Sequence, residues 1–203
     1  MTRIKICGLQ QPEHIALCTD LGVDAVGVVF VPQSPRAVSI AQAKELVAAA
    51  GPLTMVVGLF LDAAKAYVDE VLAAVALDRL QFHGREDRRY CEAFGRPYLK
   101  AVGGDAAQMR GQIHAHPNAR GILVDSHAPG SMGGTGQVLN WRQLAQDIDH
   151  PYLVLAGGLT SHNVAEAISI LRPTGVEEVE GHAPRKTATV VRGRSLGDSR
   201  TGE

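Results

Sequence analysis

The sequence predicts an α/β protein with a single (β/α)8 barrel domain, and three observations support this fold class. Apolar runs of strand length alternate with segments of helical periodicity from the N-terminus to about residue 179. The run 25–31 is apolar throughout and 54–61 is apolar after Thr54, as expected for strands that are buried on both faces. Polar residues capable of chemistry follow several strands, where barrels of this kind place their active sites. An open doubly wound sheet is the alternative, but no G-x-G-x-x-G follows the first strand.

The apolar runs of the strands are the clearest secondary-structure pattern in the sequence. The first strand alternates charged and apolar residues, whereas the later strands are short apolar runs bounded by Gly, Pro or Asp. Strands are expected at residues 3–6, 25–31, 54–61, 78–82, 97–102, 120–125, 152–156 and 175–179.

The helices between the strands are recognised by their start and stop residues. Pro12 can open the first helix and Gly22 can end it. Side chains that can cap a helix N-terminus precede most of the others, namely Ser39, Asp62, Asp105, Asn140 and Ser161. Helices are expected at residues 12–21, 40–49, 63–74, 86–94, 106–114, 141–147 and 162–171.

The eighth unit has the weakest pattern. In 175–179 only Val176 and Val179 are apolar, and the three Glu residues at 177, 178 and 180 are costly to desolvate inside a barrel. The β-branched segment 187–191 could compete for the same place. We therefore expect an atypical or incomplete eighth unit and a weakly closed barrel. Residues 1–181 form the predicted barrel domain, and 182–203 form an atypical tail that could be disordered.

Composition excludes several classes of function. The chain has 203 residues, 45% of them hydrophobic, which is ordinary for a protein with a buried core. A net charge of −1 and 4% aromatic residues argue against a nucleic-acid partner. No apolar run approaches the ~18 residues of a membrane span. The three cysteines (Cys7, Cys18, Cys91) have neither disulfide-framework nor zinc spacing, and no secretory signal precedes the first strand, so we expect a cytoplasmic protein.

The candidate functional residues fall together at the predicted mouth of the barrel. Cys7 follows the first strand, Arg36 the second and Asp125 the sixth, while Gln81 and His83 lie at the end of the fourth. Each alone has an ordinary structural interpretation, such as a buried cysteine, a surface arginine or a turn aspartate. Their shared position at one end of the barrel favours a functional one.

The chemistry of these groups favours proton transfer on a phosphorylated substrate. A thiol acts as a base when its pKa is lowered, and Lys5 or Arg36 could supply the positive charge that lowers the pKa of Cys7. A carboxyl group across the mouth could be its acid partner. Backbone amides at Gly157 and Gly158, ahead of a helix, could bind a phosphate. No metal spacing or cofactor motif is present, so neither a metal nor a cofactor is expected.

At this point the motifs resemble one family. They are Lys5-Ile6-Cys7-Gly8-Leu9, Ser34-Pro35-Arg36-Ala37-Val38, Gln81-Phe82-His83-Gly84, Val124-Asp125-Ser126, Gly133-Gly134-Thr135-Gly136 and Leu155-Ala156-Gly157-Gly158-Leu159. In this order and spacing the chain resembles the phosphoribosylanthranilate isomerase family of tryptophan biosynthesis, up to about Gly175. The resemblance implies a TIM barrel. It also implies a cofactor-free Amadori rearrangement of N-(5-phosphoribosyl)anthranilate to 1-(2-carboxyphenylamino)-1-deoxyribulose 5-phosphate.

The resemblance also implies roles for individual residues. Cys7 resembles the family's general base and Asp125 its general acid. Arg36 would face the anthranilate moiety. The implied substrate-binding set is completed by Gln81, His83, Gly134, Gly136, Gly157, Gly158 and Glu177. The expected partner is the small phosphosugar-anthranilate substrate, and the expected assembly is a monomer or homodimer without nucleic acid or membrane.

The chain departs from the family pattern after Val176. The family usually has Asp-Val-Ser-Ser-Gly-Val-Glu here, whereas this chain has Glu177-Glu178-Val179-Glu180. Two alternatives to an active isomerase remain open at this point. One is a catalytically impaired barrel that only binds a phosphosugar, and the other is a different phosphosugar barrel, such as an aldolase with Lys100 as its Schiff-base residue.

Overall fold

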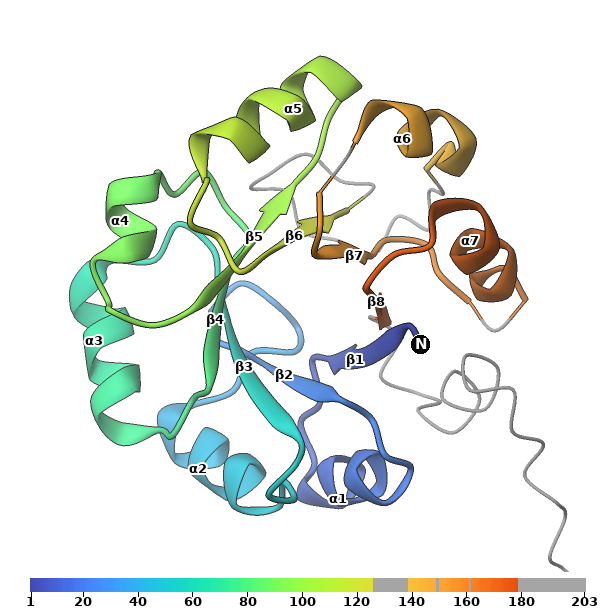
Figure 1. The fold of residues 1–203 in the computed structure, drawn as a ribbon. Coiled ribbons are helices and arrows are strands. Elements are labelled where there is room, and N and C mark those ends of the chain that lie inside the picture. Colours follow the sequence, from blue (N-terminus) through green and yellow to red (C-terminus); the bar gives the residue numbers. More distant parts are fainter. Residues whose placement is uncertain (126–138, 149, 161, 179–203) are drawn as a thin grey trace, which may run out of the picture.

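A computed structural model describes residues 1–125, 139–148, 150–160 and 162–178, and it forms a closed parallel barrel (Figure 1). Each strand pairs with the next in sequence order, and the last pairs with the first, which confirms the predicted fold class. The strands are β1 Arg3–Cys7, β2 Ala25–Val29, β3 Met55–Phe60, β4 Arg79–Phe82, β5 Tyr98–Val102, β6 Gly121–Val124, β7 Leu153–Leu155 and β8 Gly175–Glu178. The helices are α1 Pro12–Asp20, α2 Ile40–Ala48, α3 Lys65–Ala74, α4 Arg88–Glu92, α5 Ala106–Ala115, α6 Trp141–Asp147 and α7 Val164–Leu171.

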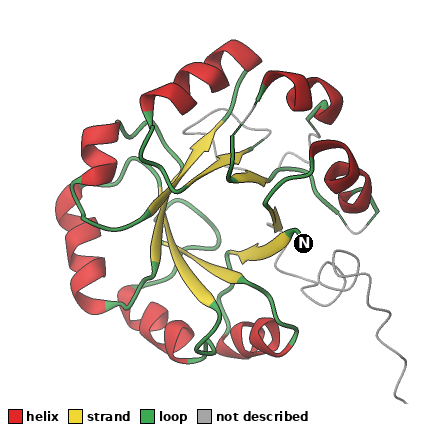
Figure 2. Ribbon diagram, viewed as in Figure 1, coloured by secondary structure: helices red, strands yellow, loops and turns green. Residues whose placement is uncertain are grey.

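The strands are apolar on both faces because each face contacts a different core. Outward side chains such as Ile4 and Ile6 of β1 pack beneath the ring of helices, which surrounds the sheet in Figure 2. Inward side chains such as Cys7, Val29 and Leu59 form a smaller cluster inside the barrel. Because successive strand residues point to opposite faces, position parity decides whether a side chain can reach the barrel interior.

Strand β8 closes the barrel, and its buried glutamate has a charged partner that the sequence does not reveal. It pairs with β1 from Arg3↔Gly175 onward and with β7 at Val154↔Gly175. Glu177 points inward and is only 1% exposed, but its Oε2 accepts a hydrogen bond from Lys5 Nζ at 2.6 Å. The cation on the neighbouring strand offsets the desolvation cost that we expected to weaken closure. The competing segment 187–191 and the boundary at 181 lie outside the described residues.

Most helices begin where the capping residues predict. Ser39, Asp105 and Asn140 each accept a hydrogen bond from the backbone amide three residues further on. The cap expected at Asp62 is wrong, because α3 begins only at Lys65 and lacks a side-chain cap. The Asp62 carboxylate instead accepts a hydrogen bond from the backbone amide of Arg85 at 2.6 Å, which ties the loop after β3 to the loop after β4. The cap expected at Ser161 lies outside the described residues.

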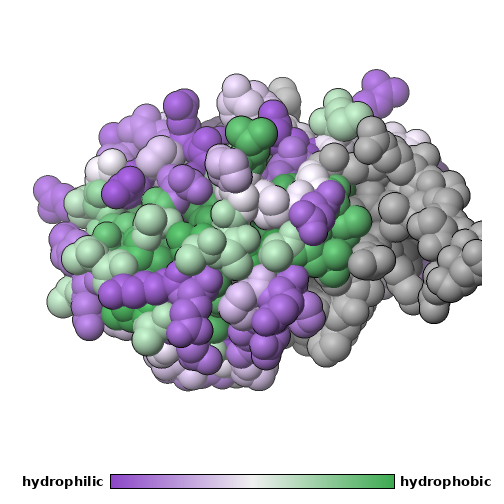
Figure 3. All heavy atoms as spheres, turned by 90° about the horizontal axis from the view of Figure 1, so that it is seen from below, coloured by the Kyte–Doolittle hydropathy of each residue, from purple (hydrophilic) through white to green (hydrophobic). Residues whose placement is uncertain are grey.

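The outer surface combines charged side chains with partly buried apolar ones. Figure 3, which views the side of the barrel that carries α1 and α2, shows a band of apolar side chains bordered by hydrophilic ones. Partly buried residues such as Leu21, Ile40 and Val47 pack against the outer core and account for apolar surface on these helices. None of the helices in the described part of the chain combines the length and apolarity needed to span a lipid bilayer.

Candidate active site

The carboxyl ends of the strands bring together five of the side chains that the sequence singles out. Cys7 ends β1, Arg36 lies in the loop after β2, Gln81 and His83 come from β4 and its loop, and Asp125 follows β6. Their contacts include two groups: Arg36 contacts the main chain of Cys7, and His83 contacts both Gln81 and Asp125. Gly134 and Gly136, also expected here, lie outside the described residues.

Lys5 and Cys7 lie two residues apart on β1 and therefore share its inward face. A glycine on β2 makes room for them, because a Cβ added to Gly27 would lie 2.5 Å from Cys7 Sγ and 2.9 Å from Lys5 Nζ. The Lys5 ammonium donates a hydrogen bond to the carboxylate of Glu177, and its charge also acts on the nearby Cys7 thiol. One buried cation is thus shared between the candidate base and the acidic residue of β8.

The pKa of Cys7 is raised, contrary to the lowered value that the sequence suggests. Burial raises the pKa of the thiol most, and the Glu177 carboxylate raises it further, while Lys5 and Arg36 act in the opposite direction. Burial alone would lower the pKa of Lys5, but the charges of Cys7 and Glu177 outweigh burial and raise it. Lys5 therefore stays charged beside the thiol, and burial decides the direction of the Cys7 shift.

Arg36 folds over the end of β1 rather than extending into solvent as an ordinary surface charge. Its Nη1 donates a hydrogen bond to the Cys7 carbonyl oxygen at 3.2 Å. Gly8 has a φ of +84°, and a Cβ at this position would lie 2.5 Å from Arg36 Cδ. The glycine is needed for its backbone conformation and for the close approach of the arginine. The guanidinium group is thus held at the barrel mouth, next to Cys7.

His83 connects Gln81 to Asp125. The Gln81 Nε2 lies 3.3 Å from His83 Nδ1, and His83 Nε2 lies 3.3 Å from Asp125 Oδ2. Gln81 and Asp125 are buried, and the His83 side chain is 13% exposed. The candidate acid is therefore approached by an imidazole from a strand two places away in the barrel.

Gly157 and Gly158 follow β7 and have φ values of +79° and +64°, which favour glycine. The sequence places them just before a helix that starts after Ser161, and in the structure α7 begins at Val164. Asn163 ties the intervening loop together: its Nδ2 donates to the Gly158 carbonyl at 2.9 Å, and its Oδ1 accepts from the Thr160 amide at 2.8 Å. Any anion held here would contact loop amides and not the first turn of α7.

Lys100, the residue on which an aldolase reading depends, points away from the barrel interior. It pairs in register with Phe82 and Ile122, which belong to the outer core. Its Nζ donates to the carbonyl oxygens of Phe82 and Gly84 and lies 3.2 Å from Glu86 Oε2. A buried ammonium with these acceptors fixes the loop after β4 and is not placed to attack a substrate at the barrel mouth.

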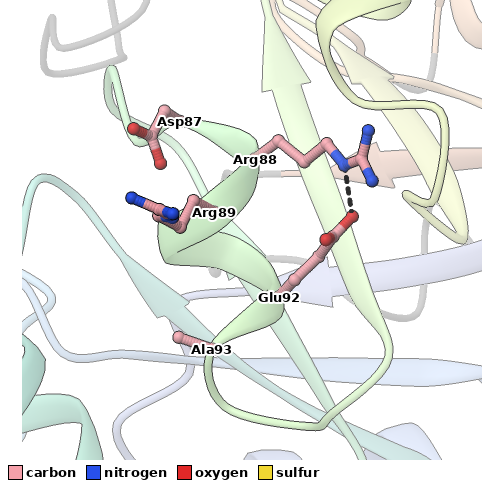
Figure 4. Close-up of a pocket in the computed structure, with 5 residues that line it drawn as sticks. All are labelled: Asp87, Arg88, Arg89, Glu92 and Ala93. Atoms are coloured by element: carbon pink, nitrogen blue, oxygen red, sulfur yellow. Dashed lines mark hydrogen bonds and ion pairs between the residues drawn. The ribbon is translucent and has the colours of Figure 1, made fainter.

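A shallow pocket lies on α4, outside the sheet (Figure 4). Its lining comes from that helix and includes Arg88 and Glu92, whose side chains form an ion pair at 2.8 Å. None of the site residues predicted from sequence lines this pocket. Within the part of the chain that is described, three or more His, Cys, Asp or Glu side chains are nowhere grouped to hold a metal ion.

Comparison with protein families gives an independent assignment. The family model for N-(5'-phosphoribosyl)anthranilate (PRA) isomerase matches residues 4–180. An N-(5'-phosphoribosyl)anthranilate isomerase from Pseudomonas savastanoi pv. phaseolicola is 45% identical over 179 residues, covering 86% of this chain and 85% of the relative. The Cellvibrio japonicus isomerase is 46% identical over 180 residues, covering 86% and 81%.

Solved structures agree with the sequence relatives. The phosphoribosyl anthranilate isomerase of Thermotoga maritima has a TM-score of 0.82 and 28% identity, covering 96% of this chain and 100% of that one. An isomerase in complex with reduced 1-(o-carboxyphenylamino)-1-deoxyribulose 5-phosphate has a TM-score of 0.81, also at 28% identity with the same coverage. From the match over residues 4–180, the identity to these relatives and the shared barrel, the chain belongs to the N-(5'-phosphoribosyl)anthranilate isomerase family, whose members are isomerases of tryptophan biosynthesis.

Proposed function

We propose that this chain converts N-(5-phosphoribosyl)anthranilate to 1-(2-carboxyphenylamino)-1-deoxyribulose 5-phosphate, with Asp125 as general acid and Cys7 as general base. The observation that carries this assignment is that a thiol at the end of β1 and a carboxyl group directly after β6 lie at the same end of the barrel. Each has its own polar partner: Lys5 for the thiol and His83 for the carboxyl group.

In the first step, Asp125 donates its proton to the furanose ring oxygen. The bond between C1 and that oxygen breaks, and its electron pair stays on the oxygen. The lone pair of the anthranilate nitrogen forms a C=N bond, which gives an open-chain Schiff base. The carboxylate left on Asp125 faces His83 Nε2 at 3.3 Å, so a donor is in place for the charge that develops there.

In the second step, the Cys7 thiolate takes the proton from C2. The C–H electron pair forms the C1=C2 bond, and the C=N electrons return to nitrogen, giving an enolamine. The enol then loses its hydroxyl proton while C1 gains one, which leaves the ketone at C2. Lys5 and Arg36 favour the thiolate, against burial and Glu177, which favour the thiol.

Substrate contacts follow from the same geometry. Arg36, held beside Cys7, would pair with the anthranilate carboxylate, and the amides of Gly157 and Gly158 would bind the phosphate. Gly134 and Gly136 would complete the phosphate side. Because Glu177 is buried against Lys5, its support for the site acts through that lysine and the position of β8.

Residues 1–181 would form the barrel domain and 182–203 a separate tail. One Thermotoga maritima relative is described as dimeric and was converted to monomers, and either state would suit this chain. The three cysteines are buried and reduced, which suits the cytoplasm.

The test is the loss of phosphoribosylanthranilate fluorescence, followed with the unmodified chain and matched variants. Cys7→Ser should nearly abolish turnover, because a hydroxyl is a far weaker base near neutral pH than a thiol. Asp125→Asn should do the same, because an amide cannot supply the acid proton. Cys18→Ser, at another buried cysteine, is the matched control and should retain turnover.

Two outcomes would contradict the proposal. Turnover that survives Cys7→Ser or Asp125→Asn would place the base or the acid elsewhere. Binding of the reduced product analogue by an unmodified chain that shows no turnover would identify a barrel that binds its ligand without catalysis.

A further inference from the structure

Gln81 points into the barrel at the level of the mouth, yet it is 0% exposed. Its Nε2 contacts His83 Nδ1, and His83 Nε2 contacts Asp125 Oδ2, each at 3.3 Å. The three side chains therefore form a line that begins in the buried interior and ends at the proposed acid. Gln81 touches the reaction only through His83.

The donors and acceptors along this line determine where the imidazole proton lies. With the Gln81 amide nitrogen facing the ring, the amide donates and His83 Nδ1 accepts, so this arrangement goes with an unprotonated Nδ1. A neutral imidazole carries one N–H, which then lies on Nε2. That N–H faces the Asp125 carboxyl group. The orientation of the Gln81 amide thus fixes the tautomer of His83.

Stability does not explain Gln81. Among the described residues, its buried Oε1 has no hydrogen-bond partner. A buried acceptor without a partner is destabilising, and an apolar residue of similar size would remove that cost. A glutamine at such a position fits a role in the site better than a role in packing.

We propose that Gln81 is a positioning residue that holds His83 in the Nε2–H tautomer, so that a preset N–H meets the negative charge that develops on Asp125. This inference rests on the proposed role of Asp125 as acid. The N–H acts mainly when the carboxyl group gives up its proton, so the contact is stronger in the transition state than in the bound substrate. Loss of Gln81 should therefore lower kcat and leave KM nearly unchanged.

The test uses two substitutions at Gln81 and one control on the same strand. Gln81→Met removes the amide at similar volume, and Gln81→Glu supplies an acceptor that draws the ring proton to Nδ1. Leu80→Met, on the outward face of β4, is the matched control. We expect both Gln81 variants to lose about tenfold or more in kcat with KM within about twofold. We expect Gln81→Met to have an unchanged or higher Tm, and Leu80→Met to keep normal kinetics.

A second measurement reads the tautomer directly. Long-range proton–nitrogen spectra of the imidazole rings show which nitrogen carries the proton, and the spectrum of His83→Asn identifies the His83 signals. The expected result is a proton on Nε2 in the unmodified chain, a mixture in Gln81→Met and a shift to Nδ1 in Gln81→Glu. This measurement needs no turnover, so it applies to every folded variant, including an inactive one.

Several results would overturn the proposal. A proton on His83 Nδ1 in the unmodified chain would mean that Nδ1 donates toward Gln81 and that Nε2 has no proton to offer Asp125. An unchanged kcat in Gln81→Met, or a loss confined to KM, would make Gln81 a structural or substrate-contacting residue. Activity that survives Asp125→Asn would instead overturn the proposed acid, and the tautomer measurement would remain separate from that failure.

Discussion

Lys5→Met tests the buried charge pair that joins the first and last strands. The substitution keeps a long side chain but removes the ammonium that lies 2.6 Å from Glu177 Oε2. The side chains of Lys5 and Glu177 are 6% and 2% exposed, so the substitution would leave the Glu177 carboxylate buried without the ammonium group that neutralises it. Removing one member of such a pair costs about 3–5 kcal/mol of unfolding free energy.

The size of this loss makes it easy to measure. For a domain of this length, 1 kcal/mol shifts Tm by about 2–4 °C, so Lys5→Met should lower Tm by about 6–20 °C. Many domains have about 5–15 kcal/mol of stability, so the variant should still fold at low temperature. The double substitution Lys5→Met with Glu177→Leu removes both charges and should recover most of the loss, because apolar replacements of buried pairs are often neutral or stabilising.

The assay is urea unfolding followed by far-UV circular dichroism, combined with calorimetric Tm values, for both single variants and the double variant. Arg110→Met is the control, because its ion pair with Asp147 is exposed and should contribute less than about 1 kcal/mol. A loss in Lys5→Met no greater than in this control would refute the reasoning. So would a double variant that is no more stable than Lys5→Met.

Three further predictions follow from the same contacts. Burial raises the pKa of the Cys7 thiol, so kcat/KM should increase with pH on the alkaline side. Lys5→Met should move this increase to higher pH, because the Lys5 charge lowers the pKa of the thiol. A kcat/KM that is already constant below about pH 8 would contradict this prediction. Burial, with a smaller effect of Lys100, lowers the pKa of His116 to about 4, so its stabilising contribution is complete above about pH 6.5 and is lost as pH falls toward 4. His116→Gln should therefore reduce the acid loss of stability, by at most about 3 kcal/mol, in urea titrations at pH values near 7 and 4.5. Gly27→Ala should lower activity because the added Cβ would clash with Cys7 Sγ and Lys5 Nζ. Gly111→Ala, in open space on α5, should keep activity and raise Tm slightly. Equal effects of the two variants on activity and on Tm would contradict this prediction.

Sequence reasoning could predict the barrel because burial on both faces leaves a local signature. The run 25–31 is apolar throughout, and β2 occupies residues 25–29 of it. Phe30 and Val31 lie beyond the last register pair of β2 with β3 and are still buried, so apolar sequence alone marks the end of the strand poorly. Placement after strands likewise pointed to Cys7, Asp125 and Arg36 as neighbours, since parallel strands align their carboxyl ends.

The contacts between distant residues could not be predicted in the same way. Lys5 and Glu177 are separated by 172 positions, and neither local pattern shows that the other will neutralise it. The direction of the Cys7 pKa depends on burial, which the presence of nearby cations does not reveal. The outward direction of Lys100, in contrast, could have been predicted from the sequence. Lys100 lies two residues from both Tyr98 and Val102 on β5, so all three side chains point to the outer face.

The pairing of β1 with β8 also constrains the order in which the molecule can be made. Lys5 emerges from the ribosome near the start of synthesis, but the carboxylate that neutralises it arrives 172 residues later. Contacts at such separation require closure of a very long loop, and they form late in folding. Until then, the cation and the thiol beside it lie on an open sheet edge, a state prone to wrong pairing. The end of β1 that carries Cys7 is therefore among the first parts of the chain to be synthesised and among the last to acquire its native contacts.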